Sequence, residues 1–286
     1  MKKYLMLLRI HHYIKNLLIF AALLCSGQLF NRTKFLSGLM AFISFCMISS
    51  VVYIINDIKD KEKDSKHPTK CHRPIAAGTI SVRKACFVAF VLLIISVICN
   101  ACTFHISSTI MLILYLVLNL GYSFGLKNIP LVDVTILVSG FIIRILYGAF
   151  VTEITVSNWL YLTVIALAFY LALGKRRNEL KQLKNNDTRE VLKSYTVSFL
   201  DKNMSMCLTL SNVFYALWSM DEKTISLYNN QYLTFTVPIV LLITMRYSLD
   251  IEGNSDGDPV EVLLHDKILL ALCIIYLSVM FVILYL

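Results

Sequence analysis

Long uncharged runs alternate with short polar segments along this chain, and the runs are too long and too continuously apolar for surface helices. One run, residues 85–126, is about twice as long as the others and is interrupted by a polar turn near residues 103–108. About 20 apolar residues suffice for a helix to cross a bilayer, so the uncharged runs predict six membrane spans. The other four runs without Asp, Glu, Lys or Arg are residues 35–56, 154–174, 224–245 and 268–286.

Three weaker segments complete this pattern. Residues 16–31 and 203–220 are apolar but short, whereas residues 131–152 contain Asp133 and Arg144. Every backbone polar group in hydrocarbon must be bonded within its own segment, which favours helices. We therefore predict an all-α polytopic membrane protein with nine transmembrane helices, forming a single integral membrane domain over residues 1–286.

The positive charges orient these helices. With a cytoplasmic N-terminus, the segments on the inner side hold 23 of the 27 Lys and Arg residues, as the positive-inside rule requires. Omitting the span at 131–152 would separate the two most basic loops, 56–84 and 175–202, onto opposite sides. We therefore predict a protein of the cytoplasmic membrane with its polar loops inside. The predicted inner segments are residues 1–15, 56–84, 125–130, 175–202 and 246–267.

Composition agrees with a membrane protein and excludes other classes. Hydrophobic residues make up 57% of the chain and charged residues only 16%, against about 25% charged in soluble domains. The net charge of +9 follows from the inner loops, and no basic groove interleaved with aromatic residues indicates nucleic-acid binding. Seven of the eight cysteines lie in apolar runs, so neither disulfides nor zinc are predicted.

The stretch INDIKDKEKD, residues 55–64, places acidic residues at the predicted cytoplasmic end of a span. Asn56, Asp57, Asp60 and Asp64 follow the pattern N-D-x-x-D-x-x-x-D, and on a helix the three aspartates fall within about 60° of arc. Clustered carboxylates need a neutralising cation, and Mg²⁺ prefers such oxygen ligands and bridges them to phosphates. The alternative is a solvated juxtamembrane helix, because lysines alternate with the acids.

The next residues, HPTKCHRP, favour the metal interpretation. Their two prolines end the helix and fix an extended segment, and Lys70 and Arg73 follow closely. A carboxylate stripe beside a rigid basic loop suits a diphosphate, since Mg²⁺ would bridge some oxygens and the cations would hold others.

These residues resemble a known family. NDIKDKEKD followed by HPTKCHRPIAAG is similar to the first aspartate-rich motif of the UbiA-type intramembrane prenyltransferases. The stretches LRIHHYIKNLLIFAAL, YSFGLKNIPLVDV and SGFIIRILYGA extend the resemblance over most of the chain. It implies a transferase whose nine helices form a bundle with a cytoplasm-facing polar cavity and which depends on Mg²⁺.

The chain departs from the usual family pattern after the sixth predicted span. A second aspartate-rich motif is expected there, but the sequence reads GKRRNELKQLK, residues 174–184. This variant, and the later YSLDIEGNSDGDPVEVLLHDK, resemble the decaprenyl-phosphate phosphoribosyltransferase branch of the family. That branch implies transfer of 5-phosphoribose from phosphoribosyl diphosphate (PRPP) to a polyprenyl phosphate, releasing diphosphate, in cell-envelope biosynthesis.

The implied reaction assigns roles to polar residues. The metal and the donor's diphosphate would be held by Asn56, Asp57, Asp60, Asp64, Lys70 and Arg73. The donor's C5 phosphate would be held by Lys175, Arg176 and Arg177, and the ribose hydroxyls by Glu179, Asp250 or Glu252. The acceptor phosphate would meet Lys15, Lys127 or Arg144. Lys127 and Tyr122 are also assigned to PRPP, and the Tyr122 and Ser123 hydroxyls would be in reach of phosphate. The direct catalytic contribution is expected from Asp57, Asp60, Arg73 and Lys175.

Two of these assignments have competing explanations. Lys175 to Arg177 would equally serve as the positive-inside anchor of the sixth span. Arg144 lies within a predicted span, where a charged residue is costly and therefore indicates a functional site. Asp133 lies on the same helix face eleven residues earlier. The alternative is a structural pair of Arg144 with an Asp or with the backbone of another helix.

Two other functions remain open. A UbiA-type enzyme that moves a prenyl group from a prenyl diphosphate to an aromatic acceptor would share the first motif, but it predicts a D-x-x-x-D pattern after span six. A cation or lipid transporter predicts inverted repeats and discontinuous helices, which the sequence does not suggest. The predicted partners are PRPP, a polyprenyl phosphate and membrane lipids, without nucleic acid; the sequence leaves a homo-oligomer open.

Overall fold

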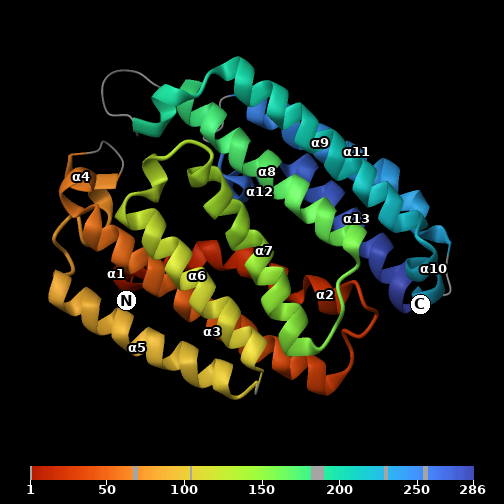
Figure 1. The fold of residues 1–286 in the computed structure, drawn as a ribbon, viewed down its shortest axis with the longest axis horizontal. Coiled ribbons are helices and arrows are strands. Elements are labelled where there is room, and N and C mark those ends of the chain that lie inside the picture. Colours follow the sequence, from red (N-terminus) through yellow and green to blue (C-terminus); the bar gives the residue numbers. More distant parts are fainter. Residues whose placement is uncertain (1, 67–69, 104, 182–189, 229–230, 254–256) are drawn as a thin grey trace. The chain divides into compact units, whose positions relative to one another are not determined.

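The protein, seen in a computed structural model, is built of helices (Figure 1). The structure describes residues 2–66, 70–103, 105–181, 190–228, 231–253 and 257–286, and these contain no strand. His67, Pro68 and Thr69 of the predicted basic loop lie outside the described residues. The chain divides into two compact units: Met1–Leu24 with Gln28–Thr155, and Cys25–Gly27 with Val156–Leu286.

In the first unit, α3 is the central helix, and it packs against η1, α5, α6 and α7. Its core includes Phe45, Tyr115 and Tyr147, all nearly fully buried. The elements of this unit are α1 (Lys2–Leu8), η1 (Ile10–Phe20), α2 (Ala21–Leu24), α3 (Arg32–Lys59), α4 (Lys61–Ser65), η2 (Lys70–His72), α5 (Val82–Ala101), α6 (Ile106–Phe124), η3 (Leu126–Asn128) and α7 (Val132–Thr152).

Polar and small residues join these apolar helices. The Ser44 hydroxyl of α3 donates to the Ser96 carbonyl of α5 at 2.8 Å, and the Tyr147 hydroxyl of α7 donates to Asn100 of α5 at 3.0 Å. Gly148 lets η1 approach α7, because a Cβ there would lie 1.9 Å from the Ile19 carbonyl oxygen. Hydrogen bonds and close backbone approach are the usual means of packing helices in lipid.

In the second unit, α8 packs along α9, and α11 contacts both α9 and α13. Tyr215, Trp218, Leu233 and Met280 form its buried apolar cluster. The elements are α8 (Asn158–Lys181), η4 (Glu190–Ser194), α9 (Val197–Met220), α10 (Glu222–Tyr228), η5 (Tyr232–Thr236), α11 (Val237–Glu252), α12 (Pro259–His265) and α13 (Lys267–Tyr285).

Comparison with the predicted spans confirms the all-helical membrane class. The turn near 103–108 is confirmed, since α5 ends at Ala101 and α6 begins at Ile106. Two predicted spans differ. The first, residues 16–31, only overlaps the shorter apolar segment Ile10–Leu24, and α9, at the predicted span 203–220, is not among the spanning candidates. The number nine and the orientation therefore remain predictions. Within the described residues, the helices long and apolar enough to cross a membrane are α3, α5, α6, α7, α8, η5 with α11, and α13.

The close approach at Gly148 yields a stability test. Gly148→Ala should lower the free energy of unfolding by about 2 kcal/mol or more, because the new methyl group meets rigid backbone. Gly38→Ala is the matched control, since its Cβ would meet side chains and no backbone, namely the Phe20 ring edge at 3.1 Å and the Thr152 methyl at 3.7 Å. Thermal unfolding of purified protein in detergent measures both variants, and equal melting temperatures would contradict this packing.

Candidate active site

The predicted acidic stripe lies at the C-terminal end of α3. Asp57 is within α3 and only 3% exposed, whereas Asp60 separates α3 from α4, and Asp64 lies in α4. The stripe is therefore not one continuous helix as predicted, because the backbone turns at Asp60 (φ −90°, ψ 7°). Asp57 and Asp64 nevertheless face a common partner.

That partner is Arg73, which the sequence placed beside the diphosphate. Its Nη1 donates to Asp57 Oδ1 at 3.1 Å and to Asp64 Oδ2 at 2.6 Å. A second guanidinium, that of Arg9, donates to the same Asp57 oxygen at 2.5 Å. Because an unpaired buried carboxylate is strongly unfavourable, these two arginines stabilise Asp57 where it stands.

The segment after α6 meets the rest of the motif. Lys127 Nζ, in η3, donates to both Asp60 carboxylate oxygens at 2.8 and 2.9 Å, and Ser123 donates to Asn56 Oδ1 at 3.1 Å. The structure thus gathers the N-terminal segment, the end of α3, the basic loop and η3. Half-buried Lys70 and Tyr122 lie in η2 and in the last turn of α6.

The donor set of this cluster fits Mg²⁺ by chemistry. Amide and carboxylate oxygens come from Asn56, Asp57, Asp60 and Asp64, and such hard oxygen donors are what Mg²⁺ prefers. In the arrangement described, protein cations contact these carboxylates, and among the described residues no three His, Cys, Asp or Glu side chains converge on one metal position. Metal binding would therefore require cations to change partners.

Arg144 lies elsewhere in the first unit, inside α7. Its Nε donates to Asn16 at 2.8 Å, its Nη1 to the Gly140 carbonyl at 2.5 Å and its Nη2 to the Tyr115 hydroxyl at 3.4 Å. Asn16 in turn contacts Ser49 of α3, about two turns from Asp57. Arg144 thus joins η1, α6 and α7. Its partners on the other helices are Asn and Tyr side chains, not the Asp or backbone group of the structural alternative.

The remaining residues of this polar side are also placed. Asp133 is fully buried in the first turn of α7. Lys15 is half-buried in η1, next to Asn16. Lys15 therefore directly precedes, in the chain, the Asn16 that accepts a hydrogen bond from Arg144.

The basic triplet near the end of α8 is spread around that helix. Lys175 donates to Asp258 at 3.0 Å, Arg176 donates to Glu179 at 2.7 Å, and Arg177 pairs with Asp201. Consecutive helical residues point about 100° apart, so each cation finds its own acid. Arg176 is fully buried and Arg177 nearly so, whereas the Lys175 side chain is 33% exposed.

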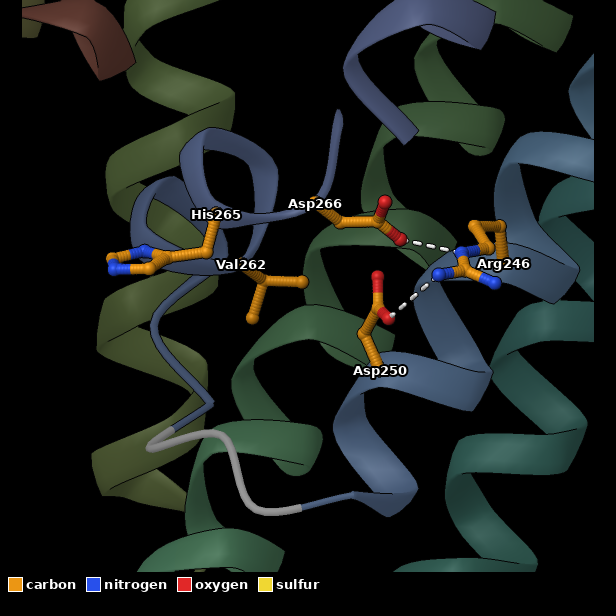
Figure 2. A pocket seen from close by; sticks show the side chains of 5 residues that line it. All are labelled: Arg246, Asp250, Val262, His265 and Asp266. Carbon is orange, nitrogen blue, oxygen red and sulfur yellow. Dashed lines mark hydrogen bonds and ion pairs between the residues drawn. The ribbon is translucent and has the colours of Figure 1, made fainter. Parts of the chain in front are cut away.

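A pocket of about 330 Å³ lies in the second unit, where Arg246, Asp250, Val262, His265 and Asp266 meet (Figure 2). Arg246 Nε pairs with Asp266, and its Nη2 lies 3.9 Å from Asp250 Oδ1. The Arg246 guanidinium holds the pKa of Asp266 at about 2, well below its usual value. Glu252, by contrast, is exposed at the end of α11.

Sequence reasoning missed several participants in this charge pairing. Arg9 had a sufficient explanation as a basic residue before the first span, so its contact with Asp57 was not predicted. The position of Asp258 at a helix start could have been predicted, because an Asp before a Pro is typical of a helix N-terminus. Its pairing with Lys175 could not, because it depends on tertiary structure. The other missed partners are Asp201, Arg246 and Asp266.

Comparison with known proteins identifies relatives of this chain. A model of the UbiA prenyltransferase family matches residues 17–260. The decaprenyl-phosphate phosphoribosyltransferase of Corynebacterium glutamicum is 33% identical over 280 residues, covering 96% of this chain and 84% of the relative. The Mycobacterium tuberculosis protein of the same name is 31% identical over 277 residues, covering 95% and 90%.

A solved structure shares the fold. It is a UbiA homolog from Archaeoglobus fulgidus bound to DMAPP and Mg²⁺, with a TM-score of 0.73 at 18% identity and 99% coverage of both chains.

The unequal exposure of the acids predicts unequal stability effects. Asp57→Asn should lower the free energy of unfolding by about 3 kcal/mol, because Arg9 and Arg73 would lose their buried counter-charge. Asp60→Asn should cost less than about 1 kcal/mol, since its pair with Lys127 is partly exposed. Thermal unfolding without added metal tests this, and equal losses would contradict the description of Asp57 as the buried centre.

Proposed function

Because the chain belongs to the UbiA prenyltransferase family, we propose that it transfers 5-phosphoribose from PRPP to a polyprenyl phosphate of the decaprenyl type. The observation that carries the proposal is the cluster at the end of α3, where acids suited to Mg²⁺ are interleaved with cations suited to phosphate. The names and coverage of the two bacterial relatives support phosphoribose as the transferred group.

The leaving diphosphate would bind at this cluster. Asn56, Asp57, Asp60 and Asp64 would hold Mg²⁺, which when bound draws electron density from the departing oxygens. Arg73 and Lys127 would then exchange carboxylate oxygens for phosphate oxygens, and Lys70 would add a further cation for the diphosphate. This exchange keeps the charges paired, because the metal would take the place of Arg73 and Lys127 beside the aspartates while these cations pair with the diphosphate.

The C5 phosphate is assigned to the basic triplet of α8. Lys175 is the strongest of the three candidates, because a third of its side chain is exposed and its partner Asp258 begins a helix. Arg177 is the second candidate. Arg176, fully buried and paired with Glu179, is suited to holding the end of α8 in place, which also makes Glu179 a weaker ribose ligand.

The ribose hydroxyls are assigned to Asp250, which lines the pocket shown in Figure 2. A carboxylate accepts hydrogen bonds from hydroxyl groups, and Arg246 fixes the side chain beside it. Glu252 is the alternative.

The acceptor phosphate is already anionic, so its attack on C1 needs no base. A lipid phosphate oxygen forms the bond to C1 while the bond from C1 to the diphosphate oxygen breaks, and diphosphate leaves with the electron pair. Attack from the opposite face predicts inversion at C1. Lys15, Lys127 and Arg144 remain the acceptor candidates. The positive-inside distribution of charge supports a cytoplasmic site, where a soluble anionic donor is available.

Prenyl transfer is the second candidate, because the structural relative from Archaeoglobus fulgidus holds DMAPP and Mg²⁺. The basic sequence GKRRNEL in place of a second acidic motif speaks against it, since cations there suit a phosphate better than a second metal.

A product assay separates these functions. Purified protein should convert PRPP and polyprenyl phosphate, with Mg²⁺, to a phosphoribosyl lipid and diphosphate, which mass spectrometry detects. Asp57→Ala and Asp60→Ala should lower the rate at least 100-fold, whereas Glu62→Gln, an exposed acid of the same segment, should have little effect. Product formed only from prenyl diphosphates, or formed equally well without Mg²⁺, would contradict the proposal.

The ribose assignment has its own test. Asp250→Asn should raise the KM for PRPP about 10-fold and reduce the preference for PRPP over its 2-deoxy analogue, because a site built for a hydroxyl discriminates against its loss. Glu261→Gln, an exposed acid on α12, is the matched control. An unchanged preference in the Asp250 variant would instead favour Glu252.

A further inference from the structure

Arg9 has a backbone conformation that an arginine rarely adopts. It stands between α1 and η1 with φ 52° and ψ 49°, in the left-handed region that favours glycine. Such a conformation persists only where the surroundings enforce it, and strained residues of this kind concentrate at functional sites. The packing around Arg9 and the contacts of its side chain account for this conformation.

The residues before and after Arg9 both contact Ser50 of α3. The Ser50 hydroxyl donates to the Leu8 carbonyl at 2.9 Å, and it also lies 2.8 Å from the Tyr13 hydroxyl. Because these bonds flank the left-handed residue, the turn is held at both ends. The strained conformation is thus specified by the packing of the N-terminal segment on α3.

This turn aims the guanidinium at Asp57. Its carbon lies 4.9 Å from the centre of the Tyr53 ring, a distance suited to a cation–π contact. Tyr53 is four residues before Asp57 and therefore on the same face of α3. The Arg9 side chain is only 16% exposed, so the ring, the turn and the carboxylate together fix its position.

Arg73 contacts the same carboxylate, but its side chain is more exposed and has a second acidic partner. It comes from the segment after α4, is 26% exposed and divides its Nη1 contacts between Asp57 and Asp64. Both guanidinia donate their hydrogen bonds on Asp57 to Oδ1, not to Oδ2. Arg73 is therefore the more exposed of the two arginines, and the hydrogen bonds of both leave Oδ2 unused.

We propose that Arg9 is a positioning residue for the metal at this cluster and that Arg73 is the cation that transfers to the diphosphate. Arg9 holds Oδ1 of Asp57, which orients the carboxylate and leaves Oδ2 for the ion. It also keeps the buried acid paired when Arg73 leaves for phosphate oxygens. This inference deepens the proposed function, on which it rests for the identity of the diphosphate-bearing ligand.

Binding of Mg²⁺ and inorganic diphosphate to detergent-purified protein tests this division, measured as the ligand-induced rise in melting temperature. Arg9→Ala should weaken the apparent Mg²⁺ affinity 10- to 100-fold, the usual loss when a group orienting a metal ligand is removed. Arg73→Ala should mainly weaken diphosphate binding at saturating Mg²⁺. Arg83→Ala, an exposed arginine of α5, is the control and should change neither.

Two further variants separate positioning from folding. Arg9→Gly relieves the strained backbone, so it should lose Mg²⁺ affinity as Arg9→Ala does while unfolding at a higher temperature than Arg9→Ala. Arg9→Lys keeps the charge and should restore part of the affinity. Wild-type Mg²⁺ affinity in both Arg9→Ala and Arg9→Gly, with only the melting temperature changed, would overturn the inference.

The binding of Mg²⁺ and diphosphate can be measured whichever group the protein transfers, so the inference and the proposed function can fail separately. If Mg²⁺ and diphosphate binding depends on Arg9 but no phosphoribosyl lipid forms, the inference holds and the proposed function fails. If phosphoribosyl lipid forms but Arg9 variants bind Mg²⁺ normally, the inference is overturned and the proposed function stands.

Discussion

The buried carboxylate of Asp57, balanced by Arg9 and Arg73, is the constraint from which the first unit's polar end is built. Asp57 and Asp60 lie where α3 ends, and the negative end of a helix dipole disfavours carboxylates. Such acids are stable there only if cations come to them. Arg9 comes from before the first apolar segment, Arg73 from the loop after α4, and Lys127 from the turn after α6. The electrostatics of one helix end therefore gather segments that are distant in sequence.

The second unit follows the same rule. Lys175, Arg177 and Arg246 each meet a carboxylate from another part of the chain, and Arg176 meets one on its own helix. Of these cations Arg176 and Arg177 are buried, and a buried charge is tolerated when paired and becomes unfavourable when its partner is lost. Anion binding by such groups is accordingly an exchange of partners, in which a phosphate replaces a carboxylate. A protein built this way can hold many charges near a membrane without exposing them unpaired.

The sequence predicted much of the fold because hydropathy and charge act locally. The charge distribution justified a helix at 131–152 despite its two charged residues, and α7 is indeed long and apolar enough to span a membrane. The first apolar segment was placed too late, because Arg9 and Lys15 suggested a polar segment, whereas the helix begins at Ile10 and ends at Leu24. The acidic motif and its basic loop were assigned to a metal and a diphosphate from their residue pattern together with the family resemblance, and that assignment stays a prediction.

What the sequence could not provide was the pairing of charges. Arg9 and Asp57 are 48 residues apart and Lys127 and Asp60 are 67 apart, so both contacts depend on helix packing. The spread of Lys175 to Arg177 around α8 could have been derived from the helical period, which makes a clamp of all three on one phosphate the weaker hypothesis. For Arg144, hydropathy identified an unusual charge but not the Asn16, Gly140 and Tyr115 groups that hold it.

A cryo-electron microscopy structure with Mg²⁺ and PRPP would test the central claim most directly. The account predicts a divalent ion about 2.1 Å from oxygens of Asp57 and Asp60, with Arg73 moved onto the diphosphate and Arg9 still on Asp57. A donor bound with its diphosphate away from the end of α3, with Arg73 still joining Asp57 to Asp64, would contradict it.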